Sequence, residues 1–305
     1  MIYILTKEYS LSKYMFSGLD GAELILTSNR KRLLVLRILR KILLAISFKI
    51  KKNCCMFFFS AKIRKKLKKI KENDDLIYIG ESVETCFVLS RICKKNQSRH
   101  VYFWNPCSSI SNFENRIKKI KSYGFNIATF DYEDSKKYNL NYVGQLYRND
   151  VFNQRPSSKY ESDFFFCGKD KGRKETLLAI KEILQPLGSC NFIIPENDDF
   201  LSYTNYINEM KKGKILLDVV QNGQTGLTIR IMESLFFQKK IITNNKSVLN
   251  YDFYNPNNIL IFDKSKTNIT DVVNFISKPY EKIDDFILDS YKVENVIRRI
   301  ICQNQ

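Results

Sequence analysis

Short apolar runs alternate with longer amphipathic segments along most of this chain. In the first half the runs are rich in β-branched and aromatic residues, and each has the length of a strand. They are residues 2–5, 22–26, 76–79, 101–104, 126–130 and 142–146. Strands that alternate with helical segments are typical of parallel sheets with crossover helices, so the pattern predicts an α/β fold.

The second half repeats this rhythm after a polar stretch. Residues 148–159 lack periodicity and contain Pro156, which predicts a linker with a domain boundary near residue 155. Five strands are then expected, with helices at 174–187 and 228–237. The strands are residues 163–167, 190–194, 215–220, 240–243 and 259–262. The sequence thus predicts two α/β domains, residues 1–155 and 156–305.

The chain ends in a segment with helical spacing of its apolar residues. Residues 284–302 carry Phe286, Ile287, Tyr291, Val296 and Ile300 at such positions. We expect one terminal helix here, long enough to return across the face between the two domains.

Composition excludes several classes of protein. The chain has 305 residues with 44% hydrophobic residues, 11 Gly and 6 Pro, which is typical of an ordered globular protein and excludes collagen-like or disordered chains. Lys and Arg number 50 against 32 Asp and Glu, a net charge of +18. That excess indicates an anionic partner: a nucleic acid, a membrane face or a phosphorylated small molecule.

The positive charge is concentrated in one block at about residues 30–71. Between Leu24 and Lys71 there are 16 Lys or Arg and no Asp or Glu. Arg30, Arg37 and Lys41 fall near one stripe of a helix whose other face is broad and apolar, and the segment Met56-Phe-Phe-Phe59 follows with three aromatic rings. This pattern predicts amphipathic helices that lie on a membrane surface. The alternative is a core helix with solvated lysines.

No segment is expected to cross a membrane. The most apolar stretch, residues 33–48, contains Arg37, Arg40 and Lys41, each of which costs about 2.5 to 3.5 kcal/mol at the centre of a spanning helix. The N-terminus reads as a first strand and not as a secretory signal. We therefore expect a cytoplasmic protein.

Cysteine and histidine usage argues against a metal site. The eight cysteines show no CxxC spacing and lie mostly in apolar runs, as reduced buried thiols do. A lone His100 cannot complete a Cys/His zinc site. No zinc-finger, ribonucleoprotein or helix-turn-helix pattern accompanies the charge, so no specific nucleic acid is expected.

A first candidate phosphate site follows the strand at 163–167. The strand ends in a basic loop with Gly168, Lys169, Lys171 and Arg173, and this loop opens a helix. Glycine allows close approach of the backbone, the helix N-terminus offers unpaired N–H groups, and the cations balance a diphosphate. Basic turns after strands are common, so an ordinary turn is the alternative.

The second candidate segment joins the strands at 215–220 and 240–243. A loop with Gly223 and Gly226 leads into a helix that carries Thr228, Arg230 and Glu233. The helix start suits a diphosphate, and a carboxylate at Glu233 suits a ribose hydroxyl. The alternative is an ordinary helix with a solvent-facing glutamate.

These segments, in this order, resemble the donor domain of bacterial two-Rossmann (GT-B) glycosyltransferases. The resemblance covers most of residues 74–262, and its best motif is the helix from Arg230 to Glu233. In the first half, residues 104–106 and 129–131 are also similar to a branch of these enzymes. More narrowly, the whole chain, with its basic block, resembles enterobacterial lipopolysaccharide core biosynthesis proteins thought to add rhamnose to the inner core.

The resemblance implies a fold, an activity and donor-binding residues. It implies two Rossmann-like domains with a basic amphipathic helical insertion in the first, and transfer of a sugar from a nucleotide sugar to the lipopolysaccharide core at the inner membrane. No metal or cofactor is implied. The implied donor-binding residues are Gly168, Lys169, Lys171, Arg173, Gly226, Thr228, Arg230 and Glu233. Thr225 stands where many retaining members have a second glutamate, eight positions before Glu233, which leaves the anomeric outcome open.

An inverting transfer needs a base near the acceptor hydroxyl. Glu81, directly after the segment 75–80, is the first candidate, followed by Asp131 and His100. Glu81 can equally cap the helix that starts near Glu84. Trp104 is expected to pack in the core, although an aromatic ring near a cleft can also stack on a sugar.

The same features leave two alternatives to this enzyme. One is a non-catalytic glycan- or membrane-binding protein of the same fold. The other is a glycosyltransferase that acts on another surface polysaccharide.

Overall fold

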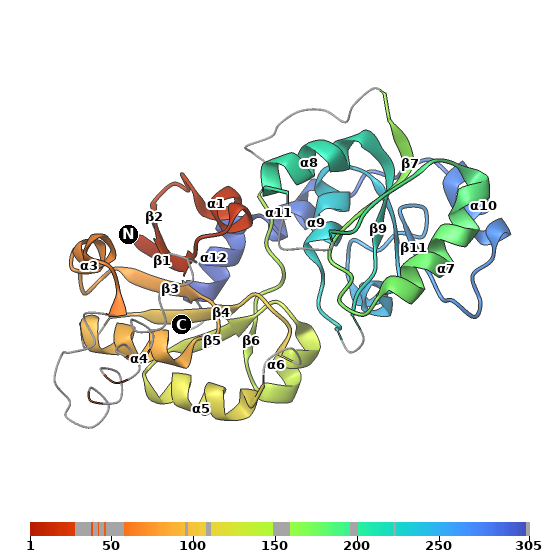
Figure 1. The fold of residues 1–305 in the computed structure, drawn as a ribbon. Helices are drawn as coiled ribbons and strands as arrows, with labels where there is room; N and C mark the ends of the chain where they lie inside the picture. The colour runs from red at the N-terminus through yellow and green to blue at the C-terminus, as the bar shows by residue number, and fades with distance from the viewer. Residues whose placement is uncertain are drawn as a thin grey trace. The chain divides into compact units, whose positions relative to one another are not determined.

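The protein is described here from a computed structural model (Figure 1). The structure describes residues 1–27, 38, 42, 46, 58–94, 97–107, 111–148, 159–195, 201–221 and 224–302. The chain forms two compact units, and each is described by itself. The first comprises Met1–Phe130, Asp134–Val143 and the chain from Ile297, and the second comprises Asp131–Glu133 and Gly144–Val296.

This division differs from the boundary expected near residue 155. The last turns of the chain belong to the first unit, because the guanidinium of Arg299 donates two hydrogen bonds, of 3.1 and 2.9 Å, to the backbone carbonyl of Val143. Most of the polar stretch expected to be the linker, residues 149–158, lies outside the described residues.

The first unit is built on a six-stranded sheet with the strand order β2-β1-β3-β4-β5-β6, and all its strand pairs are parallel. Its strands are β1 (Ile2–Lys7), β2 (Ala22–Thr27), β3 (Asp75–Ile79), β4 (Arg99–Phe103), β5 (Asn126–Thr129) and β6 (Asn141–Tyr142). Its helices include α1 (Ser10–Phe16), α3 (Ala61–Leu67), α4 (Val83–Ile92), α5 (Phe113–Ser122) and most of α6 (Tyr132–Tyr138). The strand expected at 142–146 is only the two-residue β6.

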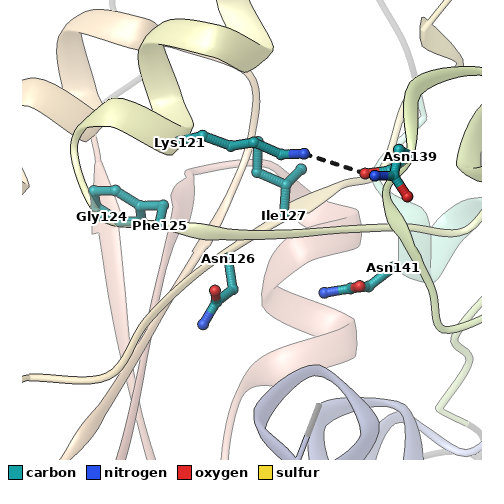
Figure 2. Close-up of a pocket in the computed structure, with 7 residues that line it drawn as sticks. All are labelled: Lys121, Gly124, Phe125, Asn126, Ile127, Asn139 and Asn141. Atoms are coloured by element: carbon teal, nitrogen blue, oxygen red, sulfur yellow. Dashed lines mark hydrogen bonds between the residues drawn. The ribbon is translucent and has the colours of Figure 1, made fainter. Parts of the chain in front are cut away.

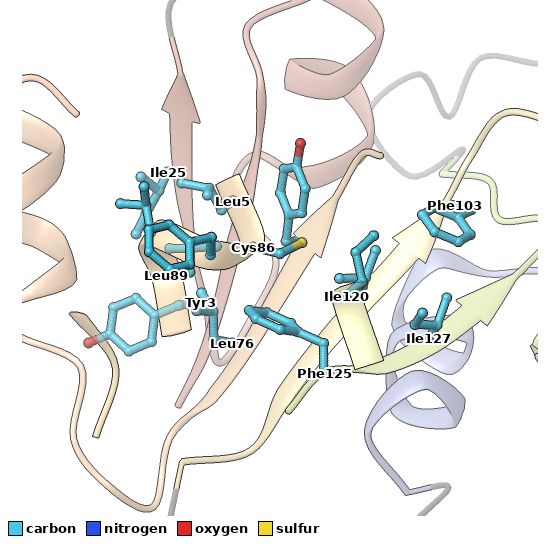
Figure 3. Close-up of a cluster of buried hydrophobic side chains, with 14 of the residues drawn as sticks. Tyr3, Leu5, Ile25, Leu76, Cys86, Leu89, Phe103, Ile120, Phe125 and Ile127 are labelled. Carbon is cyan, nitrogen blue, oxygen red and sulfur yellow. The ribbon is translucent and has the colours of Figure 1, made fainter. Parts of the chain in front are cut away.

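A cluster of buried side chains joins this sheet to its helices (Figure 3). Leu5, Leu76 and Val101 come from the central strands, and Leu89 of α4 and Ile120 of α5 pack against them. Strands covered by helices read as nearly continuous apolar runs, which is why the sequence revealed them.

Two of the phenylalanines expected at a membrane surface, Phe58 and Phe59, do not form an exposed surface. Phe58 and Phe59 are buried in the same core cluster, in edge-to-face contact with ring centroids 5.0 Å apart. The prediction that they insert into a membrane is therefore wrong for these two rings, because the hydrophobic core of the first unit takes them up.

The described end of the basic block packs against the first sheet. In α3, Ile63 and Leu67 are buried, while Lys66 forms a 2.9 Å ion pair with Glu23 of β2. The predicted amphipathic helix, with Arg30, Arg37 and Lys41, falls outside the described residues apart from Ile38, Ile42 and Ile46. No helix among the described residues is long and apolar enough to cross a membrane.

The second unit is built on a five-stranded parallel sheet with the strand order β11-β10-β9-β7-β8. Its strands are β7 (Ser162–Cys167), β8 (Cys190–Ile193), β9 (Gly213–Asp218), β10 (Lys240–Thr243) and β11 (Ile259–Ile261). Its helices include α7 (Lys174–Leu184), α8 (Tyr203–Lys212), α9 (Ile229–Phe236) and α10 (Ile269–Ser277). The α/β class predicted for both halves is confirmed.

The terminal segment is two helices instead of the single helix expected over 284–302. They are α11 (Asp285–Ser290) and α12 (Val293–Ile301). Between them the backbone bonds to Tyr147: the N–H of Tyr147 donates to the carbonyl of Tyr291 at 2.8 Å, and the N–H of Val293 donates to the carbonyl of Tyr147 at 2.9 Å. These bonds replace the bonds that would have continued one helix.

Candidate functional site

The strand order of the second sheet locates its binding edge. The chain places β8 on one side of β7 and β9 on the other, so the connection changes direction between β7 and β9. Ligands of open parallel sheets bind outside the carboxyl ends of the strands at such a switch point. Here these ends are Cys167 of β7 and Asp218 of β9.

Two arginine side chains converge at this switch point. Arg173 donates from Nε and Nη2 to the carbonyl of Lys169, at 3.0 and 2.9 Å, and from Nη1 to the carbonyl of Val219. Arg230 of α9 donates to the carbonyl of Cys167. The two guanidinium carbons lie 5.2 and 5.0 Å from the centroid of the Phe166 ring.

Gly168 is a glycine because these two groups crowd its α-carbon. A Cβ at this position would lie 2.7 Å from Nη2 of Arg173 and closer still to Nη2 of Arg230. Any side chain would therefore displace both guanidinium groups, so the identity of residue 168 is tied to the position of the two charges.

The switch point carries an excess of positive charge. Burial and the neighbouring charge of Arg230 lower the pKa of Arg173 to about 10. Partial burial and the charges of Arg173 and Arg230 also lower the pKa of Lys171. Asp218, which is fully buried, lies 3.4 Å from Arg230, and the negative charges of Asp170 and Glu233 also act on the two arginines. An anion bound here would relieve the repulsion among these cations.

The N-terminus of α7 is not open for a ligand in the way the sequence suggested. The carboxylate of Asp170 accepts hydrogen bonds from the backbone N–H groups of Arg173 and Lys174, at 3.1 and 2.7 Å. The expectation of unpaired N–H groups is therefore wrong at these two positions, since an acidic side chain in the same loop caps the helix. At this loop, an anion would therefore be bound by the charged side chains of Lys169, Lys171 and Arg173.

The second predicted segment lies beside the first. Thr228 caps α9, with its hydroxyl accepting from the N–H of Ile231 at 3.4 Å. The carbonyl of Gly226 accepts from the side-chain amide of Asn245 at 3.3 Å, and Ser247 donates to the carbonyl of Thr225. These bonds hold the loop that precedes α9, whereas Gly223 lies outside the described residues.

Glu233 is buried, with an exposed fraction of 1%, so the alternative of a solvent-facing glutamate is wrong. Its Oε1 accepts from the hydroxyl of Tyr203 at 2.7 Å, and its Oε2 accepts from the hydroxyl of Tyr206. Burial raises the pKa of Glu233, and the two tyrosine hydroxyls oppose that rise. In this structure both carboxylate oxygens are therefore bonded to α8, and because Glu233 is buried, a ribose hydroxyl can reach it only if neighbouring side chains move.

Glu81 follows β3, next to the switch point of the first sheet, where β1 lies between β2 and β3. Its carboxylate accepts from the side-chain amide of Asn105, which follows β4. The cap of α4 is Ser82, whose hydroxyl accepts from the N–H of Thr85 at 3.1 Å. Glu81 is thus not needed as a helix cap and stands at the binding edge of its sheet.

Asp131 follows β5 after one intervening residue, Phe130, and is 1% exposed. Its Oδ1 accepts from the N–H of Glu133 at 3.0 Å. The hydroxyl of Thr225 lies 3.1 and 2.9 Å from its two carboxylate oxygens, and both residues belong to the second unit. Asp131 therefore touches the loop that leads into α9.

His100 lies at the opposite end of the first sheet from Glu81. It is the second residue of β4, 1% exposed, and its Nε2 lies 2.7 Å from the hydroxyl of Ser98. Burial lowers the pKa of His100.

Trp104 is partly buried and packs edge-on against Phe16, with ring centroids 5.6 Å apart. The roles of the three base candidates stay predictions.

Three residues of this site were missed from the sequence. Asp218 lies within an apolar run that forms a predicted strand. A carboxylate in such a run needs a polar partner when it is buried, and this was the signal in the sequence. Tyr203 and Tyr206 lie on α8, where they make up two of the four buried positions, and the sequence pattern did not predict this helix. Within the described ranges, no group of three or more His, Cys, Asp or Glu residues could hold a metal ion.

Comparison with solved structures identifies the fold. No protein-family model and no curated protein matches the chain. A solved alpha-glucosyltransferase in complex with UDP and a 13-mer DNA containing a central A:G mismatch is similar, with a TM-score of 0.54 and 12% identity over 98% of this chain and 94% of that one. An alpha-glucosyltransferase in complex with UDP-glucose and DNA containing an abasic site has a TM-score of 0.51 and 12% identity, over 100% of this chain and 95% of that one. The chain has the two-Rossmann (GT-B) fold of these glycosyltransferases.

Proposed function

We propose that this chain is a glycosyltransferase whose second unit holds a nucleotide diphosphate sugar. The observation that carries the proposal is the convergence of Arg173 and Arg230 over Gly168, at the switch point of a parallel sheet. Two solved proteins of the same fold were described with UDP or UDP-glucose, which supports a nucleotide sugar as the donor.

The chemistry of sugar transfer fits this arrangement. Negative charge develops on the diphosphate as the bond to the sugar breaks, and fixed cations stabilise that charge most where water is excluded. Arg173 is only 8% exposed, and its guanidinium is held by carbonyl oxygens at a fixed position. Arg173, Arg230 and Lys171 together can stabilise the leaving diphosphate without a metal ion.

The base belongs to the acceptor side of the reaction. Glu81 and Asp131 both follow strands of the first sheet at their carboxyl ends, where acceptor groups of such folds are expected. We propose that one of them takes the proton from the acceptor hydroxyl. His100, at the amino end of β4, is the weaker candidate because it lies at the other edge of the sheet.

The acceptor we propose is the inner core of lipopolysaccharide, with rhamnose as the sugar. This rests on the resemblance to core biosynthesis proteins and on the net charge of +18, since lipid A and core sugars are anionic. Membrane contact at the cytoplasmic face of the inner membrane is part of this proposal. It is supported by Ile38, Ile42 and Ile46, which are spaced as on one helix face and are 50%, 52% and 38% exposed.

The alternative is a non-catalytic binding protein of the same fold. Titration of the purified chain with UDP and a panel of nucleotide sugars, together with assay of diphosphate release, separates the two. The enzyme requires Arg173→Ala to reduce donor affinity and turnover, while Lys174→Ala, an exposed cation in the next position, changes neither. Binding without turnover for any donor and acceptor would favour the alternative.

The acceptor is tested by mass analysis of the lipopolysaccharide core from matched cells with and without this chain. Loss of one deoxyhexose supports rhamnosyl transfer, and loss of another sugar keeps the enzyme and changes the donor. An unchanged core points to another surface polysaccharide or to the binding protein. Because both solved neighbours were described with DNA, duplex DNA is the control ligand, and we expect only nonspecific, strongly salt-dependent binding.

A further inference from the structure

A cavity at the amino end of β5 and β6 does not gather its polar groups into one site (Figure 2). Its volume is about 490 Å³, and Lys121 donates a hydrogen bond to the backbone carbonyl of Asn139 at 3.2 Å. The amides of Asn126 and Asn141 lie on the opposite face of the first sheet from Lys121. A connected set of polar side chains lies instead at the carboxyl edge of the second sheet, beside the candidate donor site.

The loop after β10 holds the loop before α9 through two side chains. Asn245, two positions after the end of β10, donates from Nδ2 to the carbonyl of Gly226 at 3.3 Å. Its Oδ1 accepts from the backbone N–H of Ser247 at 3.1 Å. The hydroxyl of Ser247 in turn donates to the carbonyl of Thr225. Asn245 and Ser247 thus fix two successive carbonyl groups of the other loop.

The side chain of Thr225 extends this set of contacts to Asp131. Its hydroxyl lies 2.9 and 3.1 Å from the two carboxylate oxygens, and the N–H of Glu133 donates to one of them at 3.0 Å. All these residues belong to the second unit. Because Ser247 holds the backbone of Thr225, it also sets the point at which the Thr225 hydroxyl meets the carboxylate.

The backbone of Asn245 connects the same loop to the arginine pair. Its N–H donates to the hydroxyl of Thr243 at 3.1 Å, and that hydroxyl donates to Oδ2 of Asp218, also at 3.1 Å. Oδ1 of Asp218 lies 3.4 Å from Nη1 of Arg230. An unbroken line of contacts therefore joins Arg230, in the candidate donor site, to Asp131, a candidate base.

This line of contacts runs through buried polar groups. Thr243, Asp218, Asn245 and Asp131 are all buried. A buried polar group costs free energy unless it is bonded, and well-packed apolar residues are often as stable as buried charges. Polar side chains that are bonded to one another do fix a single geometry. The contacts are therefore better suited to hold Arg230 and Asp131 at a fixed separation than to add stability.

We propose that Asn245 and Ser247 are positioning residues for sugar transfer, which fix Thr225 so that its hydroxyl orients the carboxylate of Asp131. In this step Asp131 accepts the proton of the acceptor hydroxyl while that oxygen bonds to the anomeric carbon. The nucleotide diphosphate leaves with the electrons of the broken bond. The inference rests on the proposed function and selects Asp131 over Glu81 as the base.

The test is steady-state kinetics of the full chain, together with UDP titration. The donor is the nucleotide sugar that the wild type turns over, and the acceptor is core lipopolysaccharide from cells without this chain. We expect Thr225→Val and Ser247→Ala to lower the turnover number by about 10- to 100-fold, since a displacement of about 1 Å can cost that much. The Kd for UDP should stay nearly constant, which also shows that the second unit is folded.

Two further variants separate positioning from a general structural role. Thr225→Ser keeps the hydroxyl and should restore most of the turnover. Lys246→Ala, between the two positioning residues, is the matched control, because its side chain is 66% exposed and pairs with Asp263 at 2.9 Å. It should change neither turnover nor UDP affinity.

The outcomes distinguish this inference from the proposed function. A wild type that turns over no donor contradicts the proposed function, and the inference with it. The inference alone is overturned if Asp131→Asn keeps full turnover, or if Thr225→Val and Ser247→Ala turn over as fast as the wild type. It is also overturned if Thr225→Ser loses as much turnover as Thr225→Val, because the hydroxyl would then contribute nothing.

Discussion

The hydroxyl of Thr225 donates to the carboxylate of Asp131, with contacts of 2.9 and 3.1 Å, although 94 positions separate the two residues. Thr225 belongs to the loop before α9, and the same loop is held by Ser247 through the carbonyl of Thr225. This contact ties a carboxylate that follows β5 to the loop that leads to Arg230. We therefore expect a change of charge at Asp131 to change the turnover number.

We predict that Asp131→Asn and Glu81→Gln differ in their effect on turnover. Loss of the general base should lower the turnover number by about 100- to 10,000-fold, while the other substitution has a much smaller effect. The affinity for UDP should stay nearly constant in both variants, because the arginine pair is held by the backbone carbonyls of Lys169 and Cys167. Steady-state kinetics and UDP titration measure the two quantities. If both variants retain full turnover, neither residue is the base.

Gly168→Ala should weaken donor binding without unfolding the chain. The new methyl group would occupy the space of the Arg173 and Arg230 side-chain nitrogens, so both guanidinium groups must shift. We expect the Kd for UDP to rise at least about tenfold, the equivalent of about 1.4 kcal/mol. Calorimetric titration measures it, with Lys174→Ala as the control. An unchanged Kd would show that the two arginines do not meet the nucleotide.

Glu233→Ala should destabilise the second unit strongly. Removal of the carboxylate takes away the acceptor of the Tyr206 hydroxyl and one of the acceptors of the Tyr203 hydroxyl, which also contacts the hydroxyl of Tyr147 at 3.2 Å; an unsatisfied buried hydroxyl costs about 1 to 3 kcal/mol. Denaturant unfolding measures the loss. Tyr206→Phe, which removes one of the two bonds, should cost less, and an equal cost for both variants would contradict the shared network.

The charge of Glu233 should also affect stability through pH. Burial raises its pKa in the folded state above the unfolded value of about 4.5, so the folded state holds the proton more tightly. Its contribution to stability is therefore fully present below pH 4.5 and is lost as the pH rises through the folded pKa. The difference in unfolding free energy between the wild type and Glu233→Gln should fall as the pH rises from about 4.5. A constant difference would contradict the shift.

The unfolding free energy of the protein should rise with pH in mildly alkaline solution, because of Lys239. Its ammonium group is buried and donates to the carbonyl oxygens of Lys211 and Gly213, and burial lowers its pKa to about 8. Between about pH 8 and the unfolded value of about 10.5, the unfolded chain binds more protons, so the unfolding free energy rises with pH. Compared with Lys239→Met, the wild type should gain stability over this range, as measured by chemical denaturation. A parallel pH dependence of the two would contradict the shift.

Ile42→Asp should reduce binding to anionic vesicles if the exposed isoleucines meet the membrane. Ile42 is 52% exposed, and an aspartate there removes apolar contact and adds repulsion from the lipid headgroups. Ile269→Asp, at a position 43% exposed on α10, is the matched control. Co-sedimentation with phosphatidylglycerol vesicles measures both, and equal effects would point to general charge instead of a specific face.

Much of the fold was predictable because parallel strands covered by helices leave a strong apolar signal. β1, β3, β7 and β10 were each found within one or two residues of their bounds. The break between α11 and α12 was not predictable, since the apolar spacing continues through it and Tyr147, far earlier in the chain, supplies the competing backbone bonds. Phe58 and Phe59 were misassigned for a related reason: an aromatic run beside lysines suits a core or a membrane equally well.

The sequence by itself determined the alternation of strands and helices, the two α/β units, and the loops in which glycine and basic residues follow a strand. These properties depend on neighbours along the chain. Only the tertiary structure decided which charges meet: it brought Arg173 and Arg230 together over Gly168, turned Glu233 inward onto two tyrosines, and placed His100 at the opposite end of its sheet from Glu81. Such pairings depend on strand order and side-chain burial, which join segments far apart in sequence and leave no periodic trace in it.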